Sequence, residues 1–303
     1  VIAACGILAF YAVLMGWTAH TFVHALFVGL PADMAEAKVF FGTVSSGNSA
    51  LLGQLLSLVL TALVVSAGVR GGIERLSRWF MPLLFLLLLL LAVWATTLSG
   101  AFEGYRTFLL RWDMHQLLNA TTVRNAFTQA FFSIGTGIGC ILAYSAYLDR
   151  RNHLPREAVA VVGMDTAVGL LAGMITFPVV MSFGLKDVVS ESTVGTLFIA
   201  LPTGLASLGF TGRLVAVLFF ALAYIAAITS SVSLLEVPVA SLMDRLGWRR
   251  RQAVWLSTAL IFVAGLPAAL DLEILGMMDA VFGGLLLIFG GLLLALLLGW
   301  RVP

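Results

Sequence analysis

The chain has 303 residues, of which 61% are hydrophobic and only 11% are charged, and its mean hydropathy is +1.06. This composition excludes a soluble globular domain, which does not need so much apolar surface, and predicts a polytopic membrane protein in a lipid bilayer. The formal net charge of +2 argues neither for nor against an acidic partner, and we expect no nucleic-acid partner.

Continuous apolar runs without period-two alternation predict helices rather than a barrel. A spanning helix needs about 20 mostly apolar residues. Eight runs meet this length: 2–28, 50–69, 78–98, 125–147, 157–185, 211–243, 253–270 and 275–300. We therefore expect an all-α protein with about eight transmembrane helices.

The loops on one side of the predicted bundle are long, at 29–49, 99–124 and 186–210. The last of them contains the apolar stretch TLFIALPTGLASLGF, which is too short to span a membrane. We expect this stretch to form a re-entrant or lid-like hairpin, broken at Pro202, Thr203 and Gly204.

Arginines gather on the other side, in the loops after the second, fourth and sixth spans and at the end of the chain. They are Arg70, Arg75, Arg78, Arg150, Arg151, Arg156, Arg245, Arg249, Arg250, Arg251 and Arg301. Cytoplasmic loops carry such an excess of positive charge. We expect these loops and both chain ends to be cytoplasmic and the protein to lie in the cell inner (plasma) membrane. The chain opens VIAACGILAF without an initiator Met, and we expect it to be a fragment of a longer protein.

The fourth run contains the stretch AFFSIGTGIGCILAY, whose centre holds Gly135, Gly137 and Gly139. Glycines weaken a helix, and an interrupted helix survives in lipid only where it lines a cavity or meets a ligand. Its exposed half-helix ends suit an anionic group at one side of the break and a cation at the other. A packing face with Gly135 and Gly139 at GxxxG spacing explains the same residues equally well.

Ionisable residues inside a span are functional candidates, because burying a charge in lipid is costly. The chain has three: Asp165, Glu236 and Asp279. Four hydroxyls also occur within five residues, at Thr229, Ser230, Ser231 and Ser233. These hydroxyls could simply bond back to the preceding helical turn. Together with Asp165, however, they supply the oxygen ligands of a hard monovalent cation such as sodium, and no site for a soft metal is visible.

His20 and His24 share one face of the first run, a spacing that can hold haem or a metal. Without a second intramembrane pair, interfacial histidines are the better interpretation. We interpret Cys5 and Cys140 as small buried hydrophobes. Because the spans contain no plausible catalytic set, we expect neither an enzyme nor an organic cofactor.

Five stretches resemble known transmembrane helices of one family, the neurotransmitter:sodium symporters. They are FYAVLMGW, GVRGGIERLSRWFMPLLF, AFFSIGTGIGCILAYSAYL, DTAVGLLAGMITFP and AITSSVSLLEVPVASLMDRLG, which resemble the third, the start of the fifth, the unwound sixth, the seventh and the eighth helix. The resemblance is to the bacterial amino-acid-transporting branch, with the leucine-transporter fold. This family is itself the standard example of inverted repeats with discontinuous helices.

The resemblance implies one transmembrane transporter domain over 1–303 that lacks the family's first two helices. Residues 1–124 would be the remainder of the first inverted repeat, helices 3–5, and residues 125–303 the second repeat, helices 6–10. The first two helices of the same protein are then a required partner, because in this family they supply much of the substrate site.

The resemblance also implies functional residues. The substrate site would include Ile7, Tyr11, Phe132, Gly135, Thr136, Ile138, Ser231 and Leu234. The sodium ligands would be Ser133, Asp165, Ala226, Thr229 and Ser230, with the carboxylate of Asp165 supplying the negative charge that chloride provides in other members. Asp279 would belong to the outer gate, and Asp244 with Tyr147 to the inner gate.

The implied function is a sodium-coupled symporter that imports an amino acid or related zwitterion by alternating access. Transported sodium ions are the expected cofactor, and the 303 residues alone should not transport. Two alternatives stay open: proton coupling with Asp165 as the titrating group, and a non-transporting membrane fragment or scaffold. The sequence does not identify the amino acid, the stoichiometry or the oligomeric state.

Overall fold

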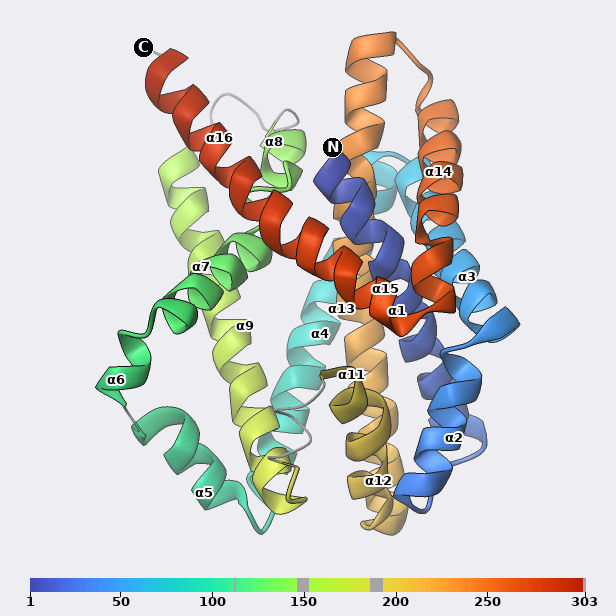
Figure 1. The fold of residues 1–303 in the computed structure, drawn as a ribbon, viewed down its shortest axis with the longest axis vertical. Coiled ribbons are helices and arrows are strands. Elements are labelled where there is room, and N and C mark those ends of the chain that lie inside the picture. The colour runs from blue at the N-terminus through green and yellow to red at the C-terminus, as the bar shows by residue number, and fades with distance from the viewer. Residues whose placement is uncertain (112, 146–152, 186–192, 302–303) are drawn as a thin grey trace.

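The computed structural model describes residues 1–111, 113–145, 153–185 and 193–301, and it confirms an all-helical protein (Figure 1). Within these residues, seven helices are long and apolar enough to cross a membrane. They are α1 (Ile2–Phe27), α3 (Gly47–Ser66), α4 (Glu74–Ala95), α9 (Leu154–Ser182), α13 (Gly209–Leu246), α14 (Arg250–Leu270) and a last unit described next.

The last unit changes its winding along its length. It comprises α15 (Leu272–Met278), the π-helical segment η4 (Asp279–Leu285) and α16 (Leu286–Arg301). A second π-helical segment, η1 (Val69–Ile73), leads into α4. π-Helical turns are rare and often occur at functional sites, so these two segments are candidates for local adjustment.

The fourth predicted span, 125–147, is not one continuous helix. It is divided into α7 (Ala120–Ile134) and α8 (Cys140–Ser145), and α8 does not continue the axis of α7 (Figure 1). The break predicted from the glycines is therefore present, and it explains why seven continuous spans are found instead of eight.

Short helices cover the end of the molecule opposite the chain termini. They are α2 (Met34–Val44), α5 (Ala101–Tyr105), η2 (Arg106–Leu110), α6 (Met114–Leu117), α11 (Thr193–Gly195), η3 (Thr196–Ala200) and α12 (Leu201–Ala206). The expected break at Pro202, Thr203 and Gly204 is wrong, because all three lie inside α12. Pro202 lies in the first turn of α12, separated by one residue from the π-helical turn η3, and a proline is tolerated in the first turn of a helix. The chain turns instead at Ser207 and Leu208, before α13.

Four helices, α1, α3, α13 and α14, all contact one another and form the best-buried unit. In α1, 67% of the most apolar 18-residue window is buried. Gly16 and Gly53 allow α1 and α3 to touch backbone to backbone: a Cβ added at Gly16 would lie 2.5 Å from the Gly53 carbonyl carbon. Small residues permit such close crossings between membrane helices.

The second group of helices is far more exposed. Only 6% of the most apolar window of α9 is buried, and 17% of the window in the α15–α16 unit. Helix α4 lies between the groups and contacts both α13 and α9. Large apolar side chains on the open faces fit a lipid environment rather than water.

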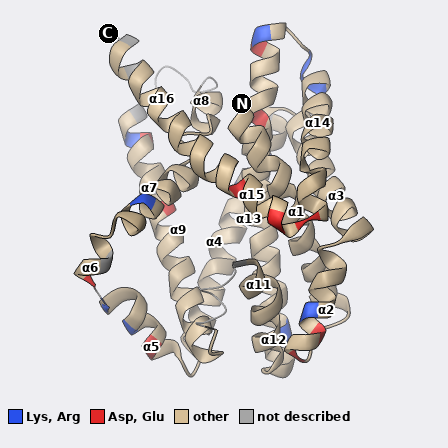
Figure 2. Cartoon of the chain, viewed as in Figure 1, with Lys and Arg blue, Asp and Glu red and all other residues tan. Residues whose placement is uncertain are grey.

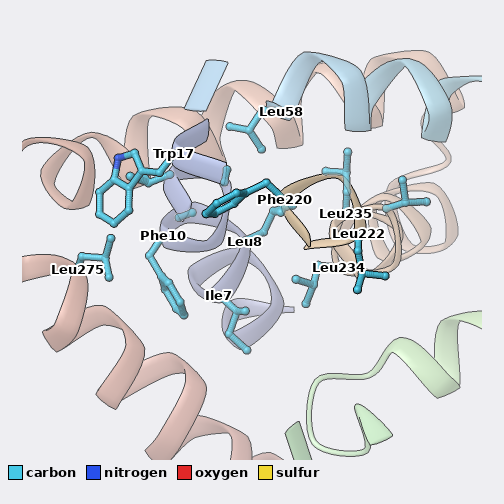
Figure 3. Close-up of a cluster of buried hydrophobic side chains, with 14 of the residues drawn as sticks. Ile7, Leu8, Phe10, Trp17, Leu58, Phe220, Leu222, Leu234, Leu235 and Leu275 are labelled. Carbon is cyan, nitrogen blue, oxygen red and sulfur yellow. The ribbon is translucent and has the colours of Figure 1, made fainter. Parts of the chain in front are cut away.

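An aromatic cluster attaches the helical segment Thr193–Ala206 to the four-helix unit. The Phe198 ring of η3 lies 5.9 Å from Trp17 of α1 and 5.5 Å from Phe41 of α2. It also stacks at 6.2 Å on Phe220 of α13. Figure 3 shows Trp17 and Phe220 in the same core as Ile7, Leu234 and Leu235.

Charged residues lie at both ends of the molecule, and further ones lie at mid-height around α15 and on α7 and α9 (Figure 2). The connections α3–α4 and α13–α14, together with both termini, lie at one end, and α2, α5 and α12 lie at the other (Figure 1). This arrangement is that of an integral membrane protein whose arginine-rich loops share one end. The loop with Arg150 and Arg151 lies outside the described residues.

Candidate functional site

The interruption between α7 and α8 consists of two left-handed glycines. Gly135 has φ +73° and Gly139 has φ +92°. The helical hydrogen-bond ladder ends with the Gly135 N–H on the Phe131 carbonyl, at 3.0 Å, and resumes with the Ala143 N–H on the Gly139 carbonyl, at 2.9 Å. The residues between them form a turn instead of a helix.

The two explanations of the glycines can now be separated. A Cβ added at Gly135 or Gly139 would meet only side-chain atoms, at 3.8 Å and 3.6 Å, so crowding does not require glycine there. The positive φ does, because other residues rarely adopt it. Close packing is the reason for Gly137, where a Cβ would lie 2.1 Å from the Leu287 carbonyl oxygen of α16.

The structure joins Ser133 and Asp165 directly. The Ser133 hydroxyl, on the last turn of α7, donates to Oδ1 of Asp165 on α9 at 2.5 Å. A hydroxyl and a carboxylate at hydrogen-bond distance can both turn their oxygens to a sodium ion, which prefers hard ligands. The pair therefore forms one oxygen group of the site, across two helices.

A second oxygen group lies on α13. Both Thr229 Oγ1 and Ser230 Oγ donate to the Ala226 carbonyl, at 2.8 Å and 3.2 Å. Ser231 and Ser233 likewise bond back to the preceding turn. Back-bonding thus occurs at all four hydroxyls, as the simpler interpretation predicts. It nevertheless gathers the three oxygens of Ala226, Thr229 and Ser230 at one point.

Tyr11 connects this second group to α1. Its hydroxyl forms a hydrogen bond with Ser230, so a predicted substrate residue touches a predicted sodium ligand. The Tyr11 side chain is half-buried, which leaves it within reach of a bound molecule.

The apolar residues assigned to the substrate pocket share one core. Ile7 is fully buried, and Ile138 and Leu234 are each 6% exposed in the same cluster (Figure 3 labels Ile7 and Leu234). Phe132 packs on this cluster and is half-buried, as is Thr136. These side chains pack in or against one core, and their role in enclosing a substrate stays a prediction.

Ser231 occupies a different environment from the other predicted substrate residues. Its fully buried Oγ lies 2.8 Å from Thr61 Oγ1 of α3 and also donates to the Ile228 carbonyl. The hydroxyl is therefore engaged with the four-helix unit, and a role in substrate binding stays a prediction.

The gate residues are only partly connected to the site. Asp279 begins η4, which packs on α1 through Phe282 and Gly6, and it is exposed. Asp244 is exposed near the end of α13. Within the described residues, neither carboxylate forms a salt bridge. Tyr147 lies outside the described residues.

Glu236 has a structural partner. Its fully buried carboxylate receives both terminal nitrogens of Arg250 from α14, at 3.0 Å and 2.5 Å. Arg250 Nε also donates to the Val65 carbonyl near the end of α3, at 2.8 Å. This buried pair ties three helices together.

A cavity of about 520 Å³ adjoins the second oxygen group. Thr229, Ser230, Ser233 and Tyr144 form one wall, and η1 with the start of α4 forms the other. Sequence reasoning had not singled out Tyr144, because a single tyrosine in an apolar helix has no distinctive pattern. Its hydroxyl lies 2.9 Å from Ser233 Oγ.

Elsewhere the polar residues have local roles. His24 Nδ1 lies 3.0 Å from the Gly29 carbonyl, and its ring lies against Phe40 at 4.2 Å. Cys5 and Cys140 are free thiols. Within the described ranges, no group of three or more His, Cys, Asp or Glu could hold a metal ion.

A helical membrane protein with an interrupted helix, and with oxygen groups beside the interruption, has features that are typical of secondary transporters. Comparison with known proteins gives the family. The model of the sodium:neurotransmitter symporter family matches residues 44–300, and the chain belongs to this family.

The chain is similar to an uncharacterized sodium-dependent transporter of Bacillus subtilis, YhdH, with 36% identity over 282 residues, covering 90% of this chain and 60% of the relative. It is 31% identical over 224 residues to sodium-dependent nutrient amino acid transporter 1 of Drosophila persimilis, covering 71% of this chain and 34% of that protein.

Among solved structures, the crystal structure of MhsT in complex with L-phenylalanine matches with a TM-score of 0.89 and 34% identity. The match covers 100% of this chain and 70% of MhsT. The resemblance stated from the sequence and the leucine-transporter-type fold are thereby confirmed. The chain spans about 60% of the length of the bacterial relative.

Proposed function

We propose that this chain is the larger part of a secondary transporter, rather than an enzyme, that couples sodium entry to the import of an amino acid or related zwitterion. One observation carries the proposal: Ser133 and Asp165 meet at 2.5 Å beside a helix interrupted by two left-handed glycines. The names of the relatives, which include an amino-acid transporter and a complex with L-phenylalanine, support it.

In this proposal the two oxygen groups hold sodium ions. Ser133 and Asp165 serve one ion, and the Ala226 carbonyl with the Thr229 and Ser230 hydroxyls serves another. All five contribute oxygens, the ligand type that a hard alkali cation prefers. Each ion offsets negative charge near the site, namely that of Asp165 or of the substrate carboxylate.

The substrate lies, in this proposal, between α1 and the interruption. Tyr11 offers a hydroxyl to the substrate carboxylate, and the half-helix end after Gly135 and Thr136 offers backbone N–H groups. Ile7, Ile138 and Leu234 enclose its side chain, Phe132 covers it, and Ser231 borders the pocket. An apolar or aromatic amino acid fits this lining best.

The wider organisation follows the same proposal. Residues 1–124 and 125–303 form parts of two inverted repeats, and the first two helices of the whole protein complete both sites. The arginine-rich end is cytoplasmic. Asp279 acts in the outer gate, Asp244 and Tyr147 act in the inner gate, and the two helix groups rock against each other during alternating access.

Binding and uptake of labelled phenylalanine by the full-length protein in liposomes, with and without a sodium gradient, test this function. We expect uptake that needs sodium. Asp165→Ala should lower sodium affinity at least about tenfold, because a charged ligand is lost. The matched control Glu157→Ala removes an exposed carboxylate from the first turn of the same helix and should leave uptake unchanged.

Uptake that does not depend on sodium would contradict the proposal. Uptake driven by a proton gradient without sodium would support the alternative in which Asp165 carries a proton. That alternative is favoured only by the carboxylate itself, whereas the Thr229 and Ser230 hydroxyls do not titrate near neutral pH and favour sodium.

A further inference from the structure

The short helix α8 docks on one residue of α13. The Tyr144 hydroxyl donates to Ser233 Oγ at 2.9 Å, and the Cys140 thiol lies 3.6 Å from the Ser233 carbonyl oxygen. Ser233 has a single hydroxyl proton, which it donates to the Thr229 carbonyl at 3.2 Å. Its oxygen is therefore the acceptor for Tyr144.

The same contact borders the cavity of about 520 Å³. Tyr144 and Ser233 share its wall with Thr229 and Ser230, whose hydroxyls belong to the second oxygen group. The opposite wall comes from η1 and the start of α4, at the end of the molecule where the arginine-rich loops gather (Figure 1). Helix α8 therefore supplies part of the cavity wall through Tyr144.

We propose that Tyr144 and Ser233 form an inner latch: their hydrogen bond holds α8 against α13 and restricts access to the Thr229 and Ser230 oxygens from the arginine-rich end. The sodium role of these oxygens rests on the proposed function. The inference that the latch closes the cavity depends only on the contact between Tyr144 and Ser233.

The two partners differ in how firmly they are held. The helix α13 is held one turn beyond Ser233 by the buried Glu236–Arg250 pair, which also reaches α3. The helix α8, described over Cys140–Ser145, follows the turn over residues 135–139, which ends at Gly139 with φ +92°. We therefore infer that α8 is the moving part and that Gly139 is its hinge.

The contact also reaches the oxygen group through a short chain of bonds. Tyr144 donates to Ser233, Ser233 donates to the Thr229 carbonyl, and the Thr229 hydroxyl donates to the Ala226 carbonyl. Binding of an ion by the Thr229 and Ala226 oxygens would therefore change the hydrogen bond between Tyr144 and Ser233.

The test measures access to the cavity in full-length protein in inside-out membrane vesicles. Ser77→Cys places a thiol on the α4 wall of the cavity in a Cys5→Ala background, and an impermeant maleimide measures its rate of reaction. Labelling of the same protein without Ser77→Cys is subtracted, which removes any contribution of Cys140.

Tyr144→Phe keeps the ring and removes only the hydroxyl. We expect it to speed labelling of Cys at 77 about two- to tenfold, the range that one neutral hydrogen bond spans. Ser233→Ala should act similarly, and the double variant should add little to either single change. The control Ser145→Ala, also on α8, removes an exposed hydroxyl that bonds only to the Leu142 carbonyl and should change nothing.

An unchanged labelling rate in Tyr144→Phe, or single effects that multiply in the double variant, would overturn the latch. The readout needs neither sodium nor substrate, so it is separate from the proposed function. Faster labelling in a protein that lacks sodium-dependent uptake would retain the latch and remove only its sodium role.

Discussion

At the scale of single residues, the most demanding interaction is the buried ion pair of Glu236 and Arg250. The carboxylate is fully buried and the guanidinium side chain is 17% exposed. Removing one partner leaves an uncompensated charge, whereas replacing both by apolar groups of similar size does not. We therefore expect the loss of one partner to lower stability, whereas the fold itself depends less on the pair.

Arg250→Met should reduce the free energy of unfolding by about 3–5 kcal/mol, because the buried Glu236 carboxylate then loses the counter-charge of Arg250. Thermal unfolding of the full-length protein in detergent measures the change. The double variant Glu236→Leu with Arg250→Met should recover most of the loss. Arg78→Met, which removes the exposed partner of Glu74, should cost less than about 1 kcal/mol. A double variant as unstable as the single one would contradict this account.

At the scale of elements, the interruption of the α7–α8 helix is determined by backbone conformation. Gly135 and Gly139 adopt left-handed angles that would strain any other residue, while Gly137 allows close contact with α16. Three glycines thus serve two purposes within five residues. In the helical segment Thr193–Ala206, by contrast, a residue that often breaks helices does not interrupt one. Pro202 lies inside α12, and the turn before α12 is π-helical.

Gly139→Ala should destabilise the full-length protein by about 1–2 kcal/mol, because alanine is strained at φ +92° although its Cβ has room. Gly163→Ala is the control. It lies in the regular helix α9 with no atom within 4 Å of the added Cβ, so it should be neutral or stabilise by up to about 1 kcal/mol. The melting temperatures of both variants, measured in one detergent, test this prediction. Equal shifts in the two variants would show that the left-handed backbone at Gly139 is not the constraint.

At the scale of the whole molecule, the helices divide into a well-buried unit of α1, α3, α13 and α14 and a more exposed group around α9. The oxygen groups are distributed over both, with Ser133 and Asp165 on α7 and α9 and the hydroxyls on α13. Rocking of one group against the other would change the distance between them, which suits alternating access.

The proposed orientation in the membrane is also testable at this scale. In full-length protein without native cysteines, Arg249→Cys between α13 and α14 should react with an impermeant maleimide only from the cytoplasmic side. Ala32→Cys, exposed before α2 at the other end, should react only from outside. Labelling of intact cells against inside-out vesicles gives the answer, and the reverse pattern would refute the assignment of the arginine-rich end.

Local chemistry in the sequence determined much of this protein. Apolar runs predicted the membrane helices to within a few residues, the glycines allowed either an interrupted helix or a packing face, and the motifs around Ser133, Asp165 and Thr229 predicted the family. These features depend on residues that are close together in the sequence, because lipid requires continuous helices and a left-handed turn requires glycine.

Only the tertiary structure decided which distant residues meet. It paired Glu236 with Arg250, engaged Ser231 with Thr61 and docked Tyr144 on Ser233 beside a cavity. It also placed the turn between α12 and α13 after Ala206 rather than at Pro202. Such contacts depend on how helices cross and rotate against one another, and that rotation is set by packing across the whole bundle rather than by any local run of residues.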